Sequence, residues 1–286
     1  MDNNLLSGLE GLGLGNLKDL NIYESEEKSG SNVKKNVQVA PSEAKEEDMV
    51  FDKTFTCPVC DEQFKAKMVR TGKAKAMLPD QDLRPRYEGI DVLKYDILSC
   101  PCCGYSGISK NFPYLTPSQK KAIRENISES FISKPDDPQK KIYTYEDAIE
   151  RHKLALVNTI VKHGKASEKA FICLKTAWLF RGQGEKLDIT LATYDAKKED
   201  CDKAEAEFLR NAYDGFIQAR TNETFPIAGM DEMTLDYLLA ALALRFEEYD
   251  TASRLVSGIL TSRSANARIK DKARDLKDIL AERKKG

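Results

Sequence analysis

The sequence predicts an α+β protein of more than one domain: a small β zinc-ribbon-like module followed by an all-α domain of tetratricopeptide-like helical repeats. Two C-x-x-C pairs within residues 51–115 predict the metal-binding module. From residue 116 to residue 286, apolar residues recur with helical spacing, which predicts the helical domain. At 286 residues the chain exceeds the usual size of one domain, so each part can hold its own core.

The overall composition is typical of a soluble protein. Charged residues make up 32% of the chain, and 45 basic against 46 acidic residues give a formal net charge of -1, which argues against a nucleic-acid coat. The longest apolar stretch, residues 237–244, is far shorter than the roughly 20 residues of a membrane-spanning helix. The first twenty residues lack the basic start of a secretory signal, and an odd cysteine count favours reduced thiols. We therefore expect a cytoplasmic protein with no membrane partner.

Residues 1–50 are expected to form a flexible N-terminal segment and linker. They hold ten acidic and five basic residues and little apolar surface to offset the entropy of ordering. Leu5, Leu9 and Leu12 can nevertheless line one face of a short helix. The alternative interpretation of residues 1–22 is thus a peptide that docks onto another protein.

The period of the apolar residues changes after residue 115. Alternating stretches at 64–70 and 92–100, bounded by turn residues, predict strands. Thr116 and Pro117 then form a helix start, with threonine as N-cap and proline at the first helical position. Helices are expected near residues 116–133, 145–163, 167–182, 199–221, 231–247, 250–262 and 266–284.

Four cysteines have the spacing of a tetrahedral metal site. Cys57 and Cys60 form one pair and Cys100 and Cys103 a second, with a 39-residue spacer between them. Each pair presents two sulfurs from one tight turn, and Gly104 lets the second turn curl under the ion. Doubling a loop costs only about 0.6 kcal/mol of closure entropy, so the long spacer is compatible with one shared ion.

The expected cofactor is one structural zinc ion, Zn²⁺. A metal closed by four thiolates has no open position for water or substrate. Four thiolates also accept iron, which is the less favoured alternative. Cys102 would close a chelate poorly with Cys100 and is interpreted as a non-ligand. A thiol or iron redox protein that uses Cys102 is a further alternative, although neither pair has the strand-to-helix setting of a thioredoxin motif.

A basic stretch lies between the two cysteine pairs. In a ribbon-like fold its side chains could contact the phosphates of a nucleic acid or ribonucleoprotein. No aromatic residues interleave them to stack on bases, so a solvated hairpin edge is the favoured interpretation. The five residues within 65–75 are Lys65, Lys67, Arg70, Lys73 and Lys75.

Small residues in the helical part have the spacing of tetratricopeptide helix pairs. Ala240 and Ala243 on one expected helix, and Ala252 after a short turn, lie where two helices would cross closely. No strict 34-residue period is present, so a generic helical bundle is the alternative. Stacked pairs of this kind form a concave surface suited to a protein or peptide.

No catalytic constellation is visible in the sequence, and we expect no enzymatic activity. The sequence has no complete phosphate-binding loop, no H-E-x-x-H and no histidine beside a candidate nucleophile. His152 and His163 are too far apart on one helix to share an ion and are interpreted as surface or partly buried residues. Cys173 and Cys201 are interpreted as core thiols.

Several longer stretches resemble a family of uncharacterised bacterial cytosolic proteins, described as a domain of unknown function. The stretches are "FTCPVCDEQF", "DQDLRPRY", "YDILSCPCCGY", "KTAWLFR" and residues 225–256, and the resemblance spans roughly residues 50–280. It implies a metal-binding part with Cys57, Cys60, Cys100 and Cys103 as ligands, then tetratricopeptide-like helices, and it implies no reaction. We therefore expect a non-enzymatic zinc-binding adaptor whose helical surface binds a protein or peptide.

Overall fold

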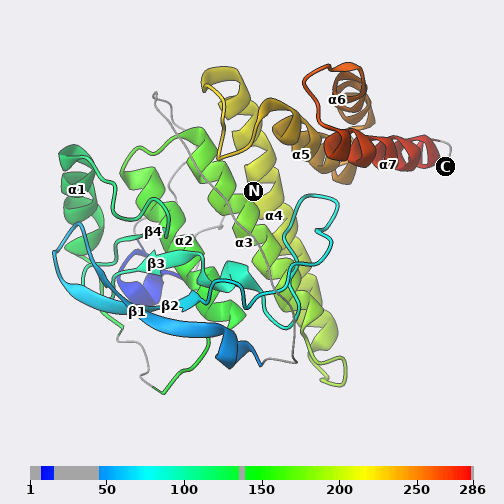
Figure 1. The fold of residues 1–286 in the computed structure, drawn as a ribbon. Helices are drawn as coiled ribbons and strands as arrows, with labels where there is room; N and C mark the ends of the chain where they lie inside the picture. Colours follow the sequence, from blue (N-terminus) through cyan, green and yellow to red (C-terminus); the bar gives the residue numbers. More distant parts are fainter. Residues whose placement is uncertain (1–7, 16–44, 135–138, 285–286) are drawn as a thin grey trace.

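Two short antiparallel hairpins form the β part of the molecule (Figure 1). The computed structural model describes residues 8–15, 45–134 and 139–284. In it, β1 (Val50–Thr56) pairs with β2 (Gln63–Val69), and β3 (Ile97–Ser99) pairs with β4 (Ser106–Ile108). Thr56 lies opposite Gln63, and Ser99 lies opposite Ser106. Each hairpin therefore closes around one of the two predicted cysteine pairs.

Helices make up most of the chain after the hairpins, as the apolar period predicts. Their bounds are α1 (Pro117–Ile123), continued by a π-helical turn (Arg124–Ser128), α2 (Tyr145–Val161), α3 (Ala166–Glu185), α4 (Tyr194–Asn222), α5 (Glu232–Arg245), α6 (Tyr249–Thr261) and α7 (Ala267–Arg283). Shorter 3-10 turns cover Glu10–Leu12, Glu46–Met49 and Val92–Tyr95. The structure thus confirms a small β region followed by a mostly helical one.

Side-chain caps fix where several helices begin. The Thr116 hydroxyl accepts from the Gln119 amide, with Pro117 at the first helical position as predicted. Thr144 caps α2 in the same way through Asp147. The first helix ends at Ser128, short of the expected residue 133, and the Ile132 amide instead donates to the Leu12 carbonyl at 2.8 Å.

The hairpins and the helices share one hydrophobic core. β3 and β4 pack against α2, and the most extensive helix contact joins α3 to α4. Helices α5, α6 and α7 pack on one another and extend away from the hairpins, toward the upper right of Figure 1. Buried residues of both hairpins and of α2 to α7 belong to the same cluster. The β part is therefore seated on the helices.

Leucines near the N-terminus also belong to this core. Leu9, Leu12 and Leu14 are buried among the core residues. This differs from the flexible start or external docking helix expected at these positions, because the three side chains bury their apolar surface within their own protein. Leu5 lies outside the described residues.

The spacer between the cysteine pairs contains ordered elements, although the stretch 92–100, predicted as a strand, is a strand only at Ile97–Ser99. It includes β2, a bridge between Ala76 and Tyr87, the turn at Val92–Tyr95 and β3. Among the described residues, no helix is long and apolar enough to cross a bilayer.

Candidate metal centre

The two cysteine pairs lie in turns with the same backbone hydrogen bonds. In the first cysteine turn, residues 57–62, the Asp61 amide donates to the Cys57 carbonyl at 2.9 Å. In the second cysteine turn, residues 100–105, the Gly104 amide donates to the Cys100 carbonyl at 3.0 Å. Asp61 and Gly104 occupy equivalent positions and both have a left-handed backbone, with φ of 63° and 74°. In the second cysteine turn, the glycine in the sequence indicates the left-handed backbone. In the first turn, aspartate adopts the same conformation, so the sequence does not reveal it.

The fold brings the four predicted ligands to one point. The Sγ atoms of Cys57, Cys60, Cys100 and Cys103 all lie within 4.8 Å of one another. The sulfurs of Cys57 and Cys103 are 3.6 Å apart, as are those of Cys60 and Cys100. Disulfide sulfurs are about 2.05 Å apart, so these are free thiols. Both of these contacts join one cysteine turn to the other, so the four sulfurs form one cluster.

This donor set fits a tetrahedral metal ion. Zinc–sulfur bonds of about 2.3 Å place the corners of a tetrahedron about 3.8 Å apart, close to the sulfur separations found here. Cys57, Cys100 and Cys103 are buried and Cys60 is partly buried. Four sulfurs would fill a tetrahedral shell, so the cluster can hold an ion but offers no place for a substrate.

The electrostatics of the thiols favour a cation at their centre. Hydrogen bonds from Cys100 and Cys103 lower the pKa of Cys57 to about 4. The pKa of Cys103 is raised far above its ordinary value by its hydrogen bonds with Cys100 and Cys57 and by burial. The cluster thus accepts one negative charge readily and resists a second, which a divalent ion would offset.

Cys102 lies outside the cluster. Its side chain is exposed, while its neighbours Cys100 and Cys103 are buried. Burial is the largest cause that raises the pKa of Cys102, followed by the charge of nearby Cys100. A raised pKa reduces the thiolate fraction at neutral pH, so Cys102 does not have the low pKa of a reactive redox cysteine.

Two side chains from the helical part hold the cysteine turns from outside. Arg124, at the start of the π-helical turn, donates from Nε to the Val59 carbonyl in the first turn at 2.9 Å. Asn158 on α2 donates from Nδ2 to the Gly104 carbonyl in the second turn at 3.0 Å. The sequence does not reveal these contacts, because the partners lie 65 and 54 residues apart.

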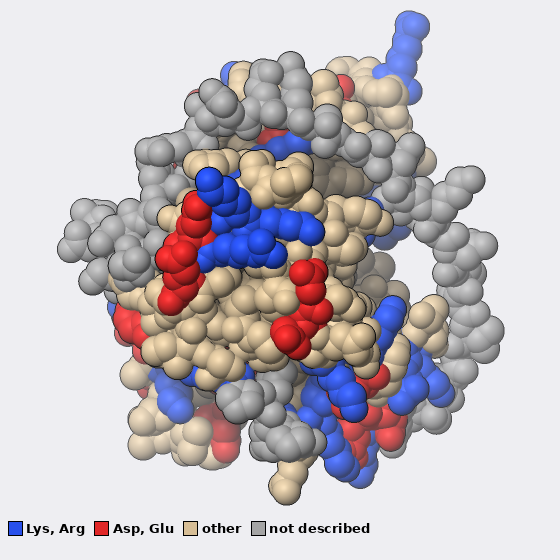
Figure 2. Space-filling model, turned by 90° about the vertical axis from the view of Figure 1, so that its left-hand side faces the viewer, with Lys and Arg blue, Asp and Glu red and all other residues tan. Residues whose placement is uncertain are grey.

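Three of the five cations of the predicted basic stretch contact other groups of the protein. Lys67 pairs with Asp52 and Lys75 pairs with Glu88, each at 2.9 Å. Arg70 donates to the Val50 carbonyl and lies over the Phe51 ring, as it would at a solvated hairpin edge. Basic side chains also gather on the side of the molecule that carries α1, with acidic side chains flanking them (Figure 2). Basic and acidic side chains are thus mixed on that side of the molecule.

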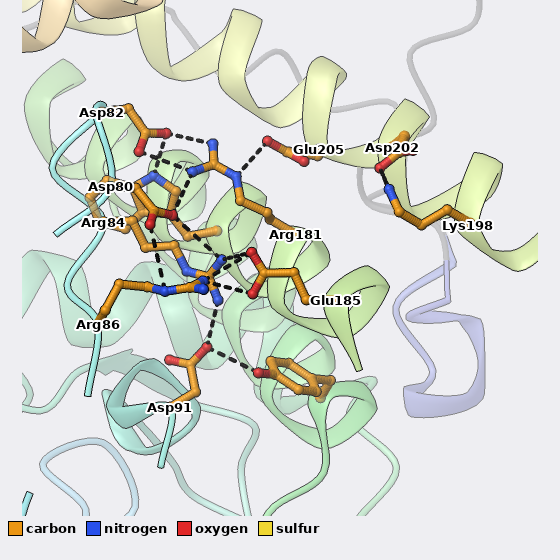
Figure 3. Close-up of polar contacts among 12 residues, drawn as sticks. Asp80, Asp82, Arg84, Arg86, Asp91, Arg181, Glu185, Lys198, Asp202 and Glu205 are labelled. Carbon is orange, nitrogen blue, oxygen red and sulfur yellow. Dashed lines mark hydrogen bonds and ion pairs between the residues drawn. The ribbon is translucent and has the colours of Figure 1, made fainter. Parts of the chain in front are cut away.

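The stretch "DQDLRPRY" has a structural role that the sequence did not indicate. Asp82 accepts from the Trp178 indole at 2.9 Å and from Arg181 at 3.0 and 2.6 Å (Figure 3). Arg181 also donates to Asp80 at 3.0 Å and to Glu205 on α4 at 2.9 Å. Burial opposes ionisation of Asp82, but the hydrogen bonds and charge of Arg181 outweigh it and lower the pKa of that carboxyl.

A second set of ion pairs continues this network along α3. Arg84 is buried and donates to Asp91 and to Glu185, each at 3.1 Å. Arg86 donates to both oxygens of the same Glu185 at 2.9 and 2.7 Å (Figure 3). A Cβ atom at Gly182 would lie 2.6 Å from Arg84 Nη2, so only glycine leaves room for the guanidinium. The network ties the spacer to α3 and α4.

His163 is exposed, as expected, but His152 has different surroundings from those predicted. His152 is completely buried rather than partly exposed, and its Nδ1 lies 2.8 Å from the Ala148 carbonyl. Burial lowers the pKa of His152 to about 4, so the ring is neutral at neutral pH. His163 follows α2 with a left-handed backbone. Cys173 and Cys201 are buried, as predicted.

A family model matches residues 50–280 of this chain, and its description reads "Uncharacterized protein conserved in bacteria (DUF2225)". The match confirms the resemblance seen in the sequence and covers both cysteine turns and the helical part as far as α7. Searches among curated proteins and among solved structures found no match.

Proposed function

This chain belongs to that family of uncharacterised proteins conserved in bacteria, and on this premise we propose that it is a cytoplasmic, non-enzymatic adaptor stabilised by zinc. One Zn²⁺ ion bound by Cys57, Cys60, Cys100 and Cys103 joins the two cysteine turns, and the helical part binds a protein or peptide. The observation that carries the proposal is the convergence of four sulfurs from two distant turns within 4.8 Å.

Zinc is proposed in preference to iron because no electron-transfer motif accompanies the four cysteines in the sequence. The cluster sits between hairpins that pack into the main core, and its four sulfurs leave no open coordination position. When bound, the ion would link the two cysteine turns directly through metal–sulfur bonds, in addition to the hydrophobic core that they share. Apparent binding free energies of structural zinc are about 10 to 16 kcal/mol in small fingers, enough to decide whether these hairpins remain folded.

The binding role is supported by the helical part. Ala240, Ala243 and Ala252 are fully buried where α5 meets α6, as expected for the close crossing of a tetratricopeptide-like pair. Ile217 on α4 and Phe225, just after it, are large apolar side chains left exposed. These two side chains are proposed as contacts for the protein or peptide partner.

Cobalt substitution tests the metal half of the proposal. Titration of the reduced, metal-free chain with Co²⁺ is expected to give intense sulfur-to-metal absorption bands that saturate at one equivalent. Cys57→Ser and Cys100→Ser should weaken these bands, whereas Cys102→Ser, the matched control in the second turn, should leave them unchanged. Absorption typical of an octahedral oxygen site would contradict a four-thiolate centre.

Affinity capture tests the binding half. The immobilised full chain should recover the same proteins repeatedly from nuclease-treated bacterial lysate, and Ile217→Glu or Phe225→Glu should reduce that recovery. The triple change Lys65→Ala, Lys67→Ala and Arg70→Ala serves as the control for nucleic-acid binding. Recovery that nuclease abolishes and that depends on the triple change would contradict a protein adaptor and favour a nucleic-acid partner.

A further inference from the structure

The carbonyl of Val59 receives two donors from one guanidinium. Val59 lies between the ligands Cys57 and Cys60 and is completely buried. Its carbonyl accepts from Arg124 Nε at 2.9 Å and also from Arg124 Nη2. Arg124 is therefore fixed on the first cysteine turn by a two-donor contact, although it belongs to the helical segment after α1.

This contact acts on the part of the turn that faces the sulfurs. The Val59 amide donates to Cys57 Sγ at 3.4 Å. The Val59 carbonyl belongs to the next peptide group, whose N–H is that of Cys60. Holding this carbonyl fixes the plane of that peptide group. It therefore also fixes the direction of the Cys60 N–H and N–Cα bonds. Hydrogen bonds in series also polarise one another, so a donor at the carbonyl strengthens the N–H at the other end.

The positive charge of Arg124 is opposite to the charge of a metal-bound thiolate cluster. Four thiolates around a divalent ion carry a net charge of about −2. A guanidinium one peptide group away offsets part of this charge and disfavours protonation of a ligand, which is the step that releases metal. Lys120 and Lys121 lie on the same helix, but no contact joins them to a cysteine turn among the described residues.

We propose that Arg124 is a positioning residue of the metal centre: it holds the first cysteine turn in its metal-bound shape and slows the loss of the ion. The proposal rests on the metal-binding function proposed above. Groups that hold ligands from outside typically change metal affinity by about 10- to 100-fold. Arg124 thus connects the helical part to metal retention through the first cysteine turn.

The second cysteine turn is held in a parallel way but offers a poorer test. Asn158 is completely buried and donates to Gly104 and to the Leu154 carbonyl, so its replacement would also disturb the core of α2. The residue Arg124 is exposed apart from its contact with Val59. Its replacement removes the contact without leaving a cavity.

Zinc release measures the effect directly. The full chain, loaded with one equivalent of Zn²⁺, is mixed with excess chromogenic chelator, and the rate of zinc loss is followed. Arg124→Gln is expected to lose zinc about 10 to 100 times faster than wild type. Arg124→Lys keeps the charge but not the paired donors, so an intermediate rate is expected. Lys121→Gln removes a cation from the same helix and should release zinc at the wild-type rate.

The outcomes separate this proposal from the one on which it rests. Wild-type protein that binds no zinc would remove the metal function itself. Wild-type protein that holds zinc, with Arg124→Gln releasing it at the same rate, would overturn only the role of Arg124. A lower melting temperature of Arg124→Gln without faster release, or equal acceleration in Lys121→Gln, would also overturn it, because either result reports general stability or general charge.

Discussion

Arg181 is the residue of the ion-pair network whose loss should destabilise the fold most. Its guanidinium contacts Asp80, Asp82 and Glu205 at 2.6 to 3.0 Å. The side chains of Asp82 and Glu205 are only 9% and 4% exposed, so water cannot replace the lost cation. Arg181→Met keeps a long apolar stem on α3 and removes the charge, which isolates the electrostatic contribution.

The structure sets the expected size of this loss. Removing one partner of a buried ion pair costs about 3 to 5 kcal/mol, because the remaining charge stays desolvated. Glu205 keeps Arg245 at 2.9 Å, and Asp82 keeps the Trp178 indole at 2.9 Å. Because these contacts remain, we expect the loss of stability in Arg181→Met to lie at the lower end of this range, at about 3 kcal/mol. The free energy of unfolding of a domain is only about 5 to 15 kcal/mol, so a loss of this size is readily measured.

Urea unfolding of the wild type and four variants tests this reasoning. The variants are Arg181→Met, Asp82→Asn, the double variant, and Lys198→Met as control. The pair of Lys198 with Asp202 on α4 is solvent-exposed, so its loss should cost at most about 0.5 kcal/mol (Figure 3). The double variant should lose about 0.5 to 3 kcal/mol less than the sum of the singles. A loss in Arg181→Met as small as that in Lys198→Met would refute a buried network.

Three further results are expected. Gly104→Ala should destabilise the fold by about 1 to 3 kcal/mol in thermal unfolding, since Gly104 has φ of 74° and the new Cβ would lie 2.4 Å from Phe131, whereas Gly258→Ala on open α6 should stabilise it by about 0.5 to 1 kcal/mol. The pKa of His152 is about 4 when folded against 6.5 in an ordinary histidine, so the unfolded state binds more protons below pH 6.5. Acidification from about pH 7.5 to about pH 5 should therefore remove about 2 kcal/mol of stability from the wild type. The loss should be smaller in His152→Gln. An equal loss in both proteins would contradict the low pKa of His152. Zinc affinity should rise between about pH 6 and about pH 8 in competition titrations, because Cys103, whose pKa is raised without metal, must lose its proton; a flat profile would argue against thiolate ligands.

Features encoded in short stretches could be predicted from the sequence. The two C-x-x-C pairs specify their own turns, and the structure brings their sulfurs together as expected. Thr116 and Pro117 begin a helix through local hydrogen bonds and a fixed backbone angle, which a single sequence displays. The presence of helices α2 to α7 follows from apolar spacing in the same way, although α4 begins at Tyr194 and not near residue 199.

Contacts between distant residues could not be predicted. Asp82 and Arg181 lie 99 residues apart, and any aspartate of the chain was an equally good partner for any arginine. Arg124 contacts a backbone carbonyl, a group that every residue has, so the sequence does not identify its partner. The polar composition of residues 1–50 does not indicate that Leu9 and Leu12 are buried. A few apolar residues within a polar stretch can still pack into a core. His152 lies among apolar residues of α2, a sequence pattern that indicates burial.

Elemental mass spectrometry of protein purified without added metal tests the central claim most directly. The account predicts about one zinc per chain in wild type and in Cys102→Ser, with the metal lost in Cys57→Ser and Cys100→Ser. These four proteins differ by single atoms at positions that the structure places inside or outside the cluster. Iron in place of zinc, or metal lost with Cys102→Ser but retained without Cys57, would contradict a structural four-thiolate zinc centre.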